Sequence, residues 1–238
     1  MRIIFSRKGF DTGSGGAASP IIDGRPVSLP IPTSRRSVTT YADVGLGEPV
    51  EQVTRGRIGR SHLCHEDPMF IGSECLFGQC GAAQSHLRNM GVGVGDTFLF
   101  FGLFAHERTG ERHHRIFGYL RVSEVVSPST DDLGHLDRPH PHTVGEWNAN
   151  NTIYRGEGGV AKHVSGELRL TQPGGPLRHW TVPGWLRSAG LSFHRKPERW
   201  LAGDRLEVVA RGQEFVTDVG DDAMAKEWLE RTIQVIRQ

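Results

Sequence analysis

The stretch Phe77–Val126 constrains the fold most, because it joins a helix signal to two strand signals. Thr97–Phe104 is too uniformly apolar for a half-exposed strand and predicts a strand covered on both faces. Ile116–Val126 alternates better between apolar and polar residues and predicts a second strand. The polar residues 105–115 between them predict a solvated hairpin loop. A β-hairpin is therefore expected at the centre of the fold.

Helices and a further strand are predicted around this hairpin. Ala82–Met90 contains good or neutral helix formers, and Gly91 follows where a glycine often ends a helix. Arg2–Phe5 is a short apolar strand signal, and Asp221–Ile236 is an amphipathic helix. A chain of 238 residues can bury a substantial core. We therefore expect a single α+β domain over residues 1–238, built on a mixed or barrel-like β-sheet with a C-terminal helix.

Charge and cysteine content limit the class of protein. Lys plus Arg total 28 and Asp plus Glu 27, which excludes an overall polybasic protein but not a local basic groove. Most of the cations are arginines, which suits phosphate or guanine contacts, although a GC-rich genome gives the same excess. No apolar run is long enough to span a membrane, and the three cysteines follow no signal peptide. We expect a soluble, cytoplasmic protein with reduced thiols.

The loop after the first strand has the composition of an anion-binding segment. Ser6–Pro20 is rich in Gly and Ser, and Arg7 and Lys8 stand at its start. Exposed backbone N–H groups and cations can together hold a phosphate. A flexible loop with two solvated cations is the alternative. The segment matches neither a P-loop nor a dinucleotide-binding motif.

Two clusters invite a metal interpretation. The first combines residues 62–67 with two later cysteines; its members are His62, Cys64, His65, Glu66, Asp67, Cys75 and Cys80. Its spacing fits no zinc knuckle or ribbon, so ordinary buried thiols are the default. In the second, His140 and His142 would point to one side of an extended segment, as in a metal pair or a phosphate clamp. No third ligand is visible nearby, so we assign hydrogen-bonding histidines and no metal ligand.

Two further groups of polar residues could contact a base. Gln79, Gln84, Ser85 and His86 stand beside small residues that let a ligand approach, so the amides could read a base edge and His86 could handle a proton. The alternative is an ordinary helix surface. In Arg211–Glu214, Glu214 could act as a general base if a pocket desolvates it, or could form a strand-end salt bridge.

Two resemblances point to nucleic acid. Gly95-Asp96 before the buried strand, with Val122-Ser-Glu-Val at the end of the next, resembles the central hairpin of the PUA, ASCH and EVE barrels. Those small barrels hold RNA or modified bases. Several motifs, taken in order, resemble the nucleotide modification associated domain of the third type, found in bacteria and phages. They are SRKGFD at 6–11, SPI at 19–21, SLPIP at 28–32, FGQ-x-GAAQSHL at 77–87, GDTFLFFG at 95–102, HPH at 140–142 and RGQEFV at 211–216.

The family resemblance implies one pocket formed by these motifs. Its expected catalytic residues are Asp11, Glu214 and His86. Its expected substrate-binding residues are Ser6, Arg7, Lys8, Gln79, Gln84, Ser85, His140, His142, Arg211 and Gln213. Such an inventory suits a phosphate and a base edge, with Asp11 or Glu214 handling a proton or a water molecule.

The resemblance implies a partner but no mechanism. We expect nucleic acid, DNA in first place, or a nucleotide as the partner, and the sequence carries no cofactor fingerprint. The leading hypothesis is an enzyme that modifies a base or removes a modified one, as a DNA glycosylase does, in the setting of DNA modification or phage defence. A non-catalytic reader with a PUA-like base pocket and a metal-dependent nuclease using Asp11, Glu214 and the histidines are the alternatives.

Overall fold

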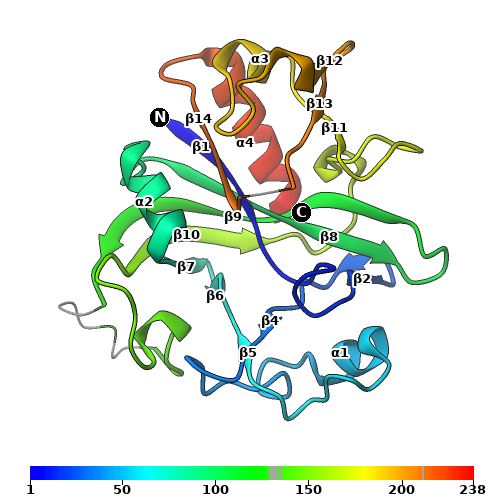
Figure 1. The fold of residues 1–238 in the computed structure, drawn as a ribbon, viewed down its shortest axis with the longest axis vertical. Coiled ribbons are helices and arrows are strands. Elements are labelled where there is room, and N and C mark those ends of the chain that lie inside the picture. Colours follow the sequence, from blue (N-terminus) through cyan, green and yellow to red (C-terminus); the bar gives the residue numbers. More distant parts are fainter. Residues whose placement is uncertain (129–132, 134–135, 211) are drawn as a thin grey trace.

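A mixed β-sheet runs through the middle of the molecule in the computed structural model (Figure 1), which describes residues 1–128, 133, 136–210 and 212–238. Its main path of strands is β14-β1-β8-β9-β10-β7-β6, and β2 and β3 extend it beside β8. The strand bounds are β1 Arg2–Arg7, β2 Ser19–Ile22, β3 Arg25–Pro26, β6 Met69–Ile71, β7 Glu74–Gln79, β8 Thr97–His106, β9 Arg112–Val126, β10 Thr152–Val160 and β14 Glu214–Asp218.

Strand β1 lies between segments that are distant in the chain. It pairs in parallel with β8, where Ile3 is opposite Thr97, and antiparallel with β14, where Ser6 is opposite Glu214. A parallel pair needs covered faces, and the apolar residues of β1 and β8 provide for this. The predicted strands at both positions are thus confirmed, and β8 is buried along Thr97–Phe104.

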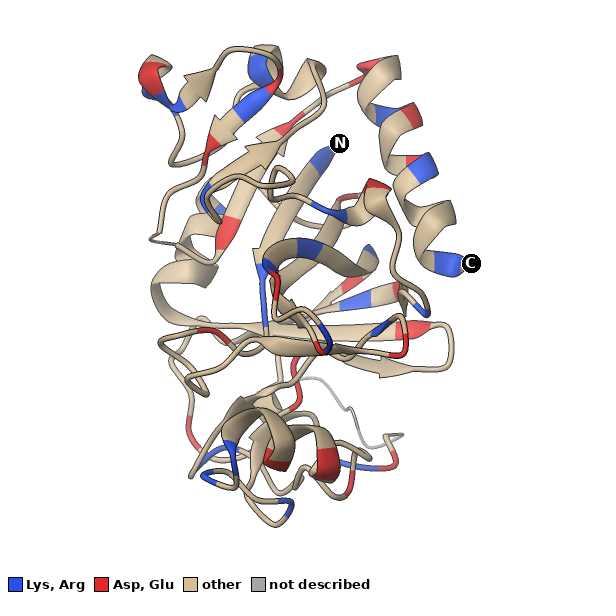
Figure 2. Ribbon diagram, turned by 90° about the vertical axis from the view of Figure 1, so that its right-hand side faces the viewer, with Lys and Arg blue, Asp and Glu red and all other residues tan. Residues whose placement is uncertain are grey.

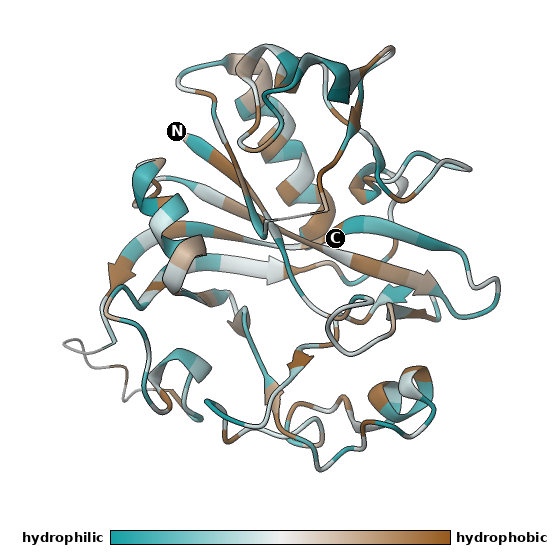
Figure 3. Ribbon diagram, viewed as in Figure 1, coloured by the Kyte–Doolittle hydropathy of each residue, from teal (hydrophilic) through white to brown (hydrophobic). Residues whose placement is uncertain are grey.

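Separate apolar clusters cover the two faces of the sheet. On one face, Phe5 and Phe101 pack with Trp180 and with residues of helix α4 (Ala223–Arg237). On the other face, Phe77 and other aromatic residues pack with helix α2 (Gly81–Asn89). Hydrophobic residues accordingly gather on the central strands, while the tip of the β8–β9 hairpin is hydrophilic (Figure 3). The sheet is therefore the middle layer of the molecule.

Helix α4 confirms the predicted C-terminal helix. Asp222 caps its start, because its Oδ1 accepts hydrogen bonds from the N–H groups of Met224 and Ala225. Ala225, Leu229 and other apolar residues spaced three or four apart are buried against the sheet. A helix of this pattern gains its stability from the packing of that face.

The remaining elements form two smaller parts. Beside α4 lies a three-stranded sheet; its members and the adjoining helices are β11 His179–Thr181, β12 Trp200–Leu201, β13 Arg205–Glu207, α3 Trp185–Ala189, and the 3-10 turns Gly166–Leu168 and Pro197–Arg199. Below the main sheet in Figure 1, residues of α1 and the loops around it bury a third cluster. This part contains α1 Gly47–Thr54, β4 Ile31–Pro32 and β5 Cys64–His65, and the 3-10 turn Pro141–Thr143 lies near β7.

The structure refines two expectations. Of the predicted sheet forms the mixed sheet is present, and the described strands do not close into a barrel. The hairpin loop is shorter than residues 105–115, because β8 continues to His106 and β9 begins at Arg112. His113 and Arg115 are buried there, and Arg115 donates a hydrogen bond to the Ser165 carbonyl. The local polar sequence does not predict this burial, because the segment that covers the two residues is distant in the chain.

Charge and hydropathy add two observations. Acidic and basic residues are interspersed over the ribbon (Figure 2), in line with the near-balanced charge. No helix in the described part of the chain is long and apolar enough to cross a membrane.

Candidate functional site

A pocket of about 370 Å³ lies where the loops after β1 and β7 meet the segment before β14. Lys8 and Asp11 contribute from the first loop, Gln79 from the end of β7, and Gln213 from the third segment. These three segments contain the motifs at residues 6–11, 77–87 and 211–216 of the sequence. A volume of this size is within the range of small-molecule sites.

Lys8 lines the pocket and forms a buried ion pair with Glu214. Its Nζ lies 2.9 Å from Oε1 of Glu214, and the same oxygen accepts a hydrogen bond from Gln79 Nε2 at 2.9 Å. Nζ also lies 4.2 Å from the centre of the Phe77 ring, a cation–π contact. Glu214 is buried beneath Lys8 and Gln79, and its Oε2 has no hydrogen-bond partner among the described residues. The Glu214 carboxylate thus fixes the Lys8 ammonium group and the Gln79 amide relative to each other.

Asp11 shapes the loop that follows β1. Its Oδ1 accepts hydrogen bonds from the N–H groups of Gly13 at 2.7 Å and Ser14 at 2.6 Å. Gly15 then adopts a φ of +82°, and a Cβ there would lie 2.6 Å from the Phe10 ring, so the turn requires glycine. Asp11 lines the pocket while this turn occupies one of its oxygens.

Arg7 lines the pocket but is largely committed to the backbone. Its guanidinium donates hydrogen bonds to the carbonyls of Val209, at 3.2 Å, and Ala210, at 3.0 Å. Burial lowers the pKa of Arg7 from its ordinary value, and the charge of Asp11 opposes that shift. Arg7 therefore secures the segment before β14 as well as adding positive charge to the pocket.

Asp67 also lines the pocket and is at the centre of a cluster of three histidines. Its Oδ2 lies 3.6 Å from Nε2 of both His65 and His142, and its Oδ1 lies 3.5 Å from Nε2 of His140. Oδ1 also accepts a hydrogen bond from the Gly78 N–H at 2.9 Å. Burial alone would raise the pKa of Asp67, but hydrogen bonds from His140 and His65 hold it well below its ordinary value. The neighbouring histidines therefore favour the ionised form of this carboxyl group.

His142 is held in place from several sides. Its ring stacks on Trp147 with centroids 4.0 Å apart, and its Nδ1 lies 2.5 Å from Oδ1 of Asn151. A Cβ on Gly78 would lie 2.3 Å from the His142 ring, so glycine is required for this close approach. Burial lowers the pKa of His142 to about 4, which keeps the ring neutral at neutral pH.

Several predicted site residues lie outside the residues that line this pocket. Gln84 accepts a hydrogen bond from Tyr154, Ser85 accepts one from Asn150, and His86 contacts Ser192 at 3.1 Å. Burial lowers the pKa of His86, against the effect of Glu214. Ser6 is buried in β1 opposite Glu214. Helix α2 therefore contributes to the packing behind the pocket more than to its lining.

The remaining predicted residues are divided between the pocket and its support. Gln213 and His142 line the pocket, and His140 is fully buried behind them. Both histidines direct Nε2 toward Asp67, although the segment is a 3-10 turn and not extended. Arg211 lies outside the described residues.

Sequence reasoning missed the roles of His65, Asp67 and Trp147. His65 and Asp67 were grouped with cysteines whose spacing fits no zinc motif, and the partner they meet comes from another loop. His65 and Asp67 have the same two-residue spacing as His140 and His142, but this spacing does not predict that the two segments meet. No sequence pattern around Trp147 indicates that its ring stacks on His142.

Comparison with known proteins gives a single finding. The sequence model of the family described as nucleotide modification associated domain 3 matches residues 2–218. No curated protein and no solved structure shows significant similarity to the chain. The family match spans every segment that forms the pocket.

Proposed function

The chain belongs to the nucleotide modification associated domain 3 family, and from this premise we propose that it is an enzyme acting on a nucleotide or on a base in nucleic acid. The pocket at the end of β1 is its active site in this proposal. The observation that carries the proposal is the convergence of Lys8, Asp11, Gln79 and Gln213 in one pocket beside the Asp67 cluster.

The chemistry of the pocket suits a nucleotide. Lys8 and Arg7 offer positive charge for a phosphate, and the amides of Gln79 and Gln213 offer donors and acceptors for a base edge. Gln79 is anchored through Glu214 and through the Cys80 N–H, which donates to its Oε1 at 3.0 Å. An amide fixed in this way distinguishes a donor from an acceptor on a ligand.

A neighbouring cavity favours a polymer over a free nucleotide. It has a volume of about 420 Å³, and it shares Arg7, Lys8 and Asp11 with the first pocket. Arg178 and Arg199 add positive charge along it, and Glu207 lies 3.7 Å and 3.8 Å from them. Two neighbouring cavities that share lining residues and have cations along them suit consecutive phosphates of a nucleic-acid strand. DNA is the substrate we propose to test first.

Asp11 is the candidate for proton transfer that a substrate can reach. It lines both cavities, whereas Glu214 lies beneath the pocket and would act by orienting Lys8 and Gln79. Modification of a base and removal of a modified base are both compatible with a carboxylate at this position.

The test is mass spectrometry of nucleosides and released bases after incubation of the purified protein with modified and unmodified DNA. A new nucleoside or a free base supports the enzyme. Tight binding to one DNA without any product would overturn the enzyme in favour of a non-catalytic reader. Shortened strands would favour a nuclease, and neither binding nor product with DNA, RNA and nucleotides would contradict the proposal as a whole.

A further inference from the structure

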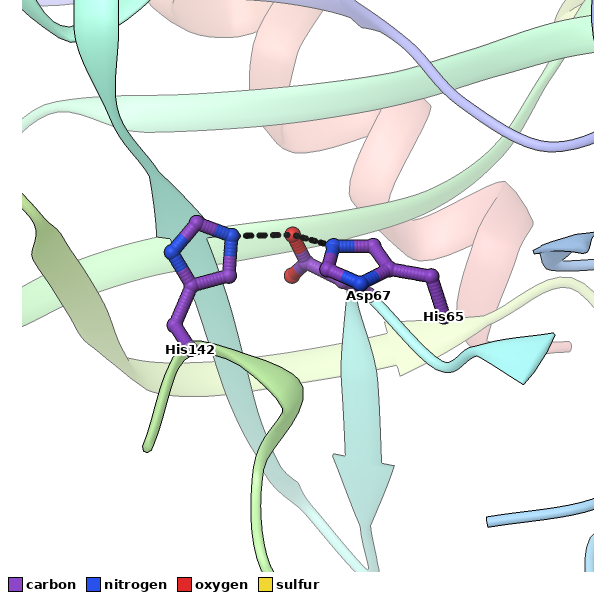
Figure 4. Close-up of side chains that lie close together, drawn as sticks. All are labelled: His65, Asp67 and His142. Carbon is purple, nitrogen blue, oxygen red and sulfur yellow. Dashed lines mark ion pairs between the residues drawn. The ribbon is translucent and has the colours of Figure 1, made fainter. Parts of the chain in front are cut away.

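His65, Asp67 and His142 present three ligand atoms to one point on the pocket wall. These atoms lie within 4.8 Å of one another, and both histidine Nε2 atoms are 3.6 Å from Asp67 Oδ2. Figure 4 shows the carboxylate between the two rings, with Nε2 of each ring directed toward it. Ligand atoms about 2.1 Å from a tetrahedral zinc ion are separated by about 3.4 Å. The two distances of 3.6 Å from Asp67 Oδ2 to the histidine Nε2 atoms are close to this value.

The hydrogen bonds of Asn151 assign the tautomer of His142. Asn151 Nδ2 donates to the His142 carbonyl at 2.8 Å, which turns its Oδ1 toward the ring. Nδ1 of His142 must therefore carry the proton that it donates to Oδ1. With the Nδ1 position occupied in this way, Nε2 is the nitrogen left to bind a metal ion, and it faces Asp67. Histidines that bind metals are commonly oriented by such an acceptor at the other nitrogen.

Contacts with Oδ1 orient the Asp67 carboxylate as well. Its Oδ1 accepts from the Gly78 N–H and faces Nε2 of His140. His140 Nδ1 accepts the N–H of His142 at 3.1 Å, so the proton of a neutral His140 is on Nε2 and points to Asp67. Oδ2 is thereby left to face the other two rings. A carboxylate oxygen opposite the lone pair of Nε2 is a favourable arrangement once a cation lies between them.

We propose that His65, Asp67 and His142 bind one divalent transition-metal ion of the Zn²⁺ or Fe²⁺ type, with His140 and Asn151 as positioning residues. Two imidazoles and one carboxylate are a donor set for both ions, and three protein ligands leave coordination positions open. All three residues line the pocket, so those positions can hold water or a ligand atom there. This proposal differs from the expectation of no metal ligand, which depends on the absence of a third ligand close to His140 and His142 in the sequence. This inference stands on the cluster alone and does not require the proposed function.

The first test measures metal binding without any nucleic acid. The protein is stripped with a chelator, and Co²⁺, Zn²⁺ and anaerobic Fe²⁺ are titrated separately against a competing chelator. We expect one equivalent of ion, with visible Co²⁺ absorption bands of a nitrogen- and oxygen-bound site. His65→Ala should weaken binding at least tenfold, whereas His163→Ala, at an exposed histidine, should leave it unchanged. The metal content of the protein as purified, measured before the chelator treatment, distinguishes zinc from iron, because sites with nitrogen and oxygen ligands generally bind Zn²⁺ more tightly than Fe²⁺.

A second measurement uses the unaltered protein, so its result does not depend on whether the His65→Ala variant folds. Diethyl pyrocarbonate modifies accessible imidazoles, and mass spectrometry maps the modified residues. Metal should protect half-buried His65 and leave His163 reactive. Absence of stoichiometric binding, equal affinity in folded His65→Ala, or no protection of His65 would overturn the proposal. Because no substrate is present, these results are separate from success or failure of the proposed enzyme.

Discussion

Lys8 and Glu214 are 206 residues apart in the chain, yet Lys8 Nζ lies 2.9 Å from Oε1 of Glu214. The pair is buried, with 10% of the Lys8 side chain and 1% of the Glu214 side chain exposed. Gln79 donates to the same oxygen, so three segments of the pocket depend on one carboxylate. Removing one member of such a pair leaves the other charge buried without compensation.

Replacement of Lys8 by methionine is therefore expected to lower the free energy of unfolding by about 3 kcal/mol. Urea denaturation followed by circular dichroism measures this change. Lys162→Met, at an exposed lysine, is the control and should change it by less than about 0.5 kcal/mol. Equal stability of the two variants would show that the Lys8–Glu214 pair contributes little.

Asp11→Asn is expected to abolish turnover of the substrate identified by mass spectrometry, while folding and binding persist. Asparagine keeps the oxygen that accepts from Gly13 and Ser14, but it loses the negative charge and the proton-accepting group. Glu214→Gln should likewise abolish turnover, in this case by releasing Lys8 and Gln79. Full turnover in both variants would remove these two carboxylates from the mechanism.

Gly78→Ala is expected to displace the His142 ring and to cost about 1–3 kcal/mol of stability. The new Cβ would lie 2.3 Å from the ring, while the N–H that donates to Asp67 remains. Histidine ring signals in NMR spectra report the displacement. Gly93→Ala is the control, since no atom lies within 4 Å of a Cβ at that position. An unmoved His142 signal in Gly78→Ala would contradict the packing described here.

Acid is expected to destabilise the protein through His194. Burial lowers its pKa from 6.5 to about 4, and its Nε2 accepts a hydrogen bond from the Val209 N–H. Between about pH 4 and 6.5 the unfolded chain binds a proton that folded His194 does not, so stability falls as the pH is lowered through this window.

His194→Asn should reduce the slope of unfolding free energy against pH in that window by up to about 1.4 kcal/mol per pH unit. Denaturation curves at half-unit pH steps provide the slope. His113 and His114 have pKa values lowered by burial to about 4 as well, so part of the slope should remain. A slope identical to that of the unaltered protein would exclude His194 as a contributor.

The sequence predicted those parts of the fold that depend on regular apolar patterns. Phe98–Phe101 are apolar at every position and lie in a strand covered on both faces, and Ala225 and Leu229 repeat at helical spacing on α4. Lys8 and Gln79 were likewise expected in one pocket from the family motifs, and the structure brings them to the same carboxylate.

The cluster around Asp67 could not be predicted, because its geometry depends on tertiary contacts. A hydrogen bond from the Gly78 N–H orients Asp67, and hydrogen bonds with Asn151 orient His142. Neither contact produces a periodic pattern in the sequence. Tertiary contacts also explain why the burial of Arg115 is not predicted. The polar sequence around it predicts a solvated loop, but residues near Ser165 cover it.

The place of β1 between β8 and β14 has a consequence for synthesis on the ribosome. Strand β1 is made before both of its neighbours, so an emerging chain must hold an apolar strand without one of its two partners until β14 has also been made. Such late pairing of distant segments slows folding. It also means that a chain made only as far as β13 lacks the carboxylate of Glu214, which fixes Lys8 and Gln79, so the pocket is complete only once β14 has been made.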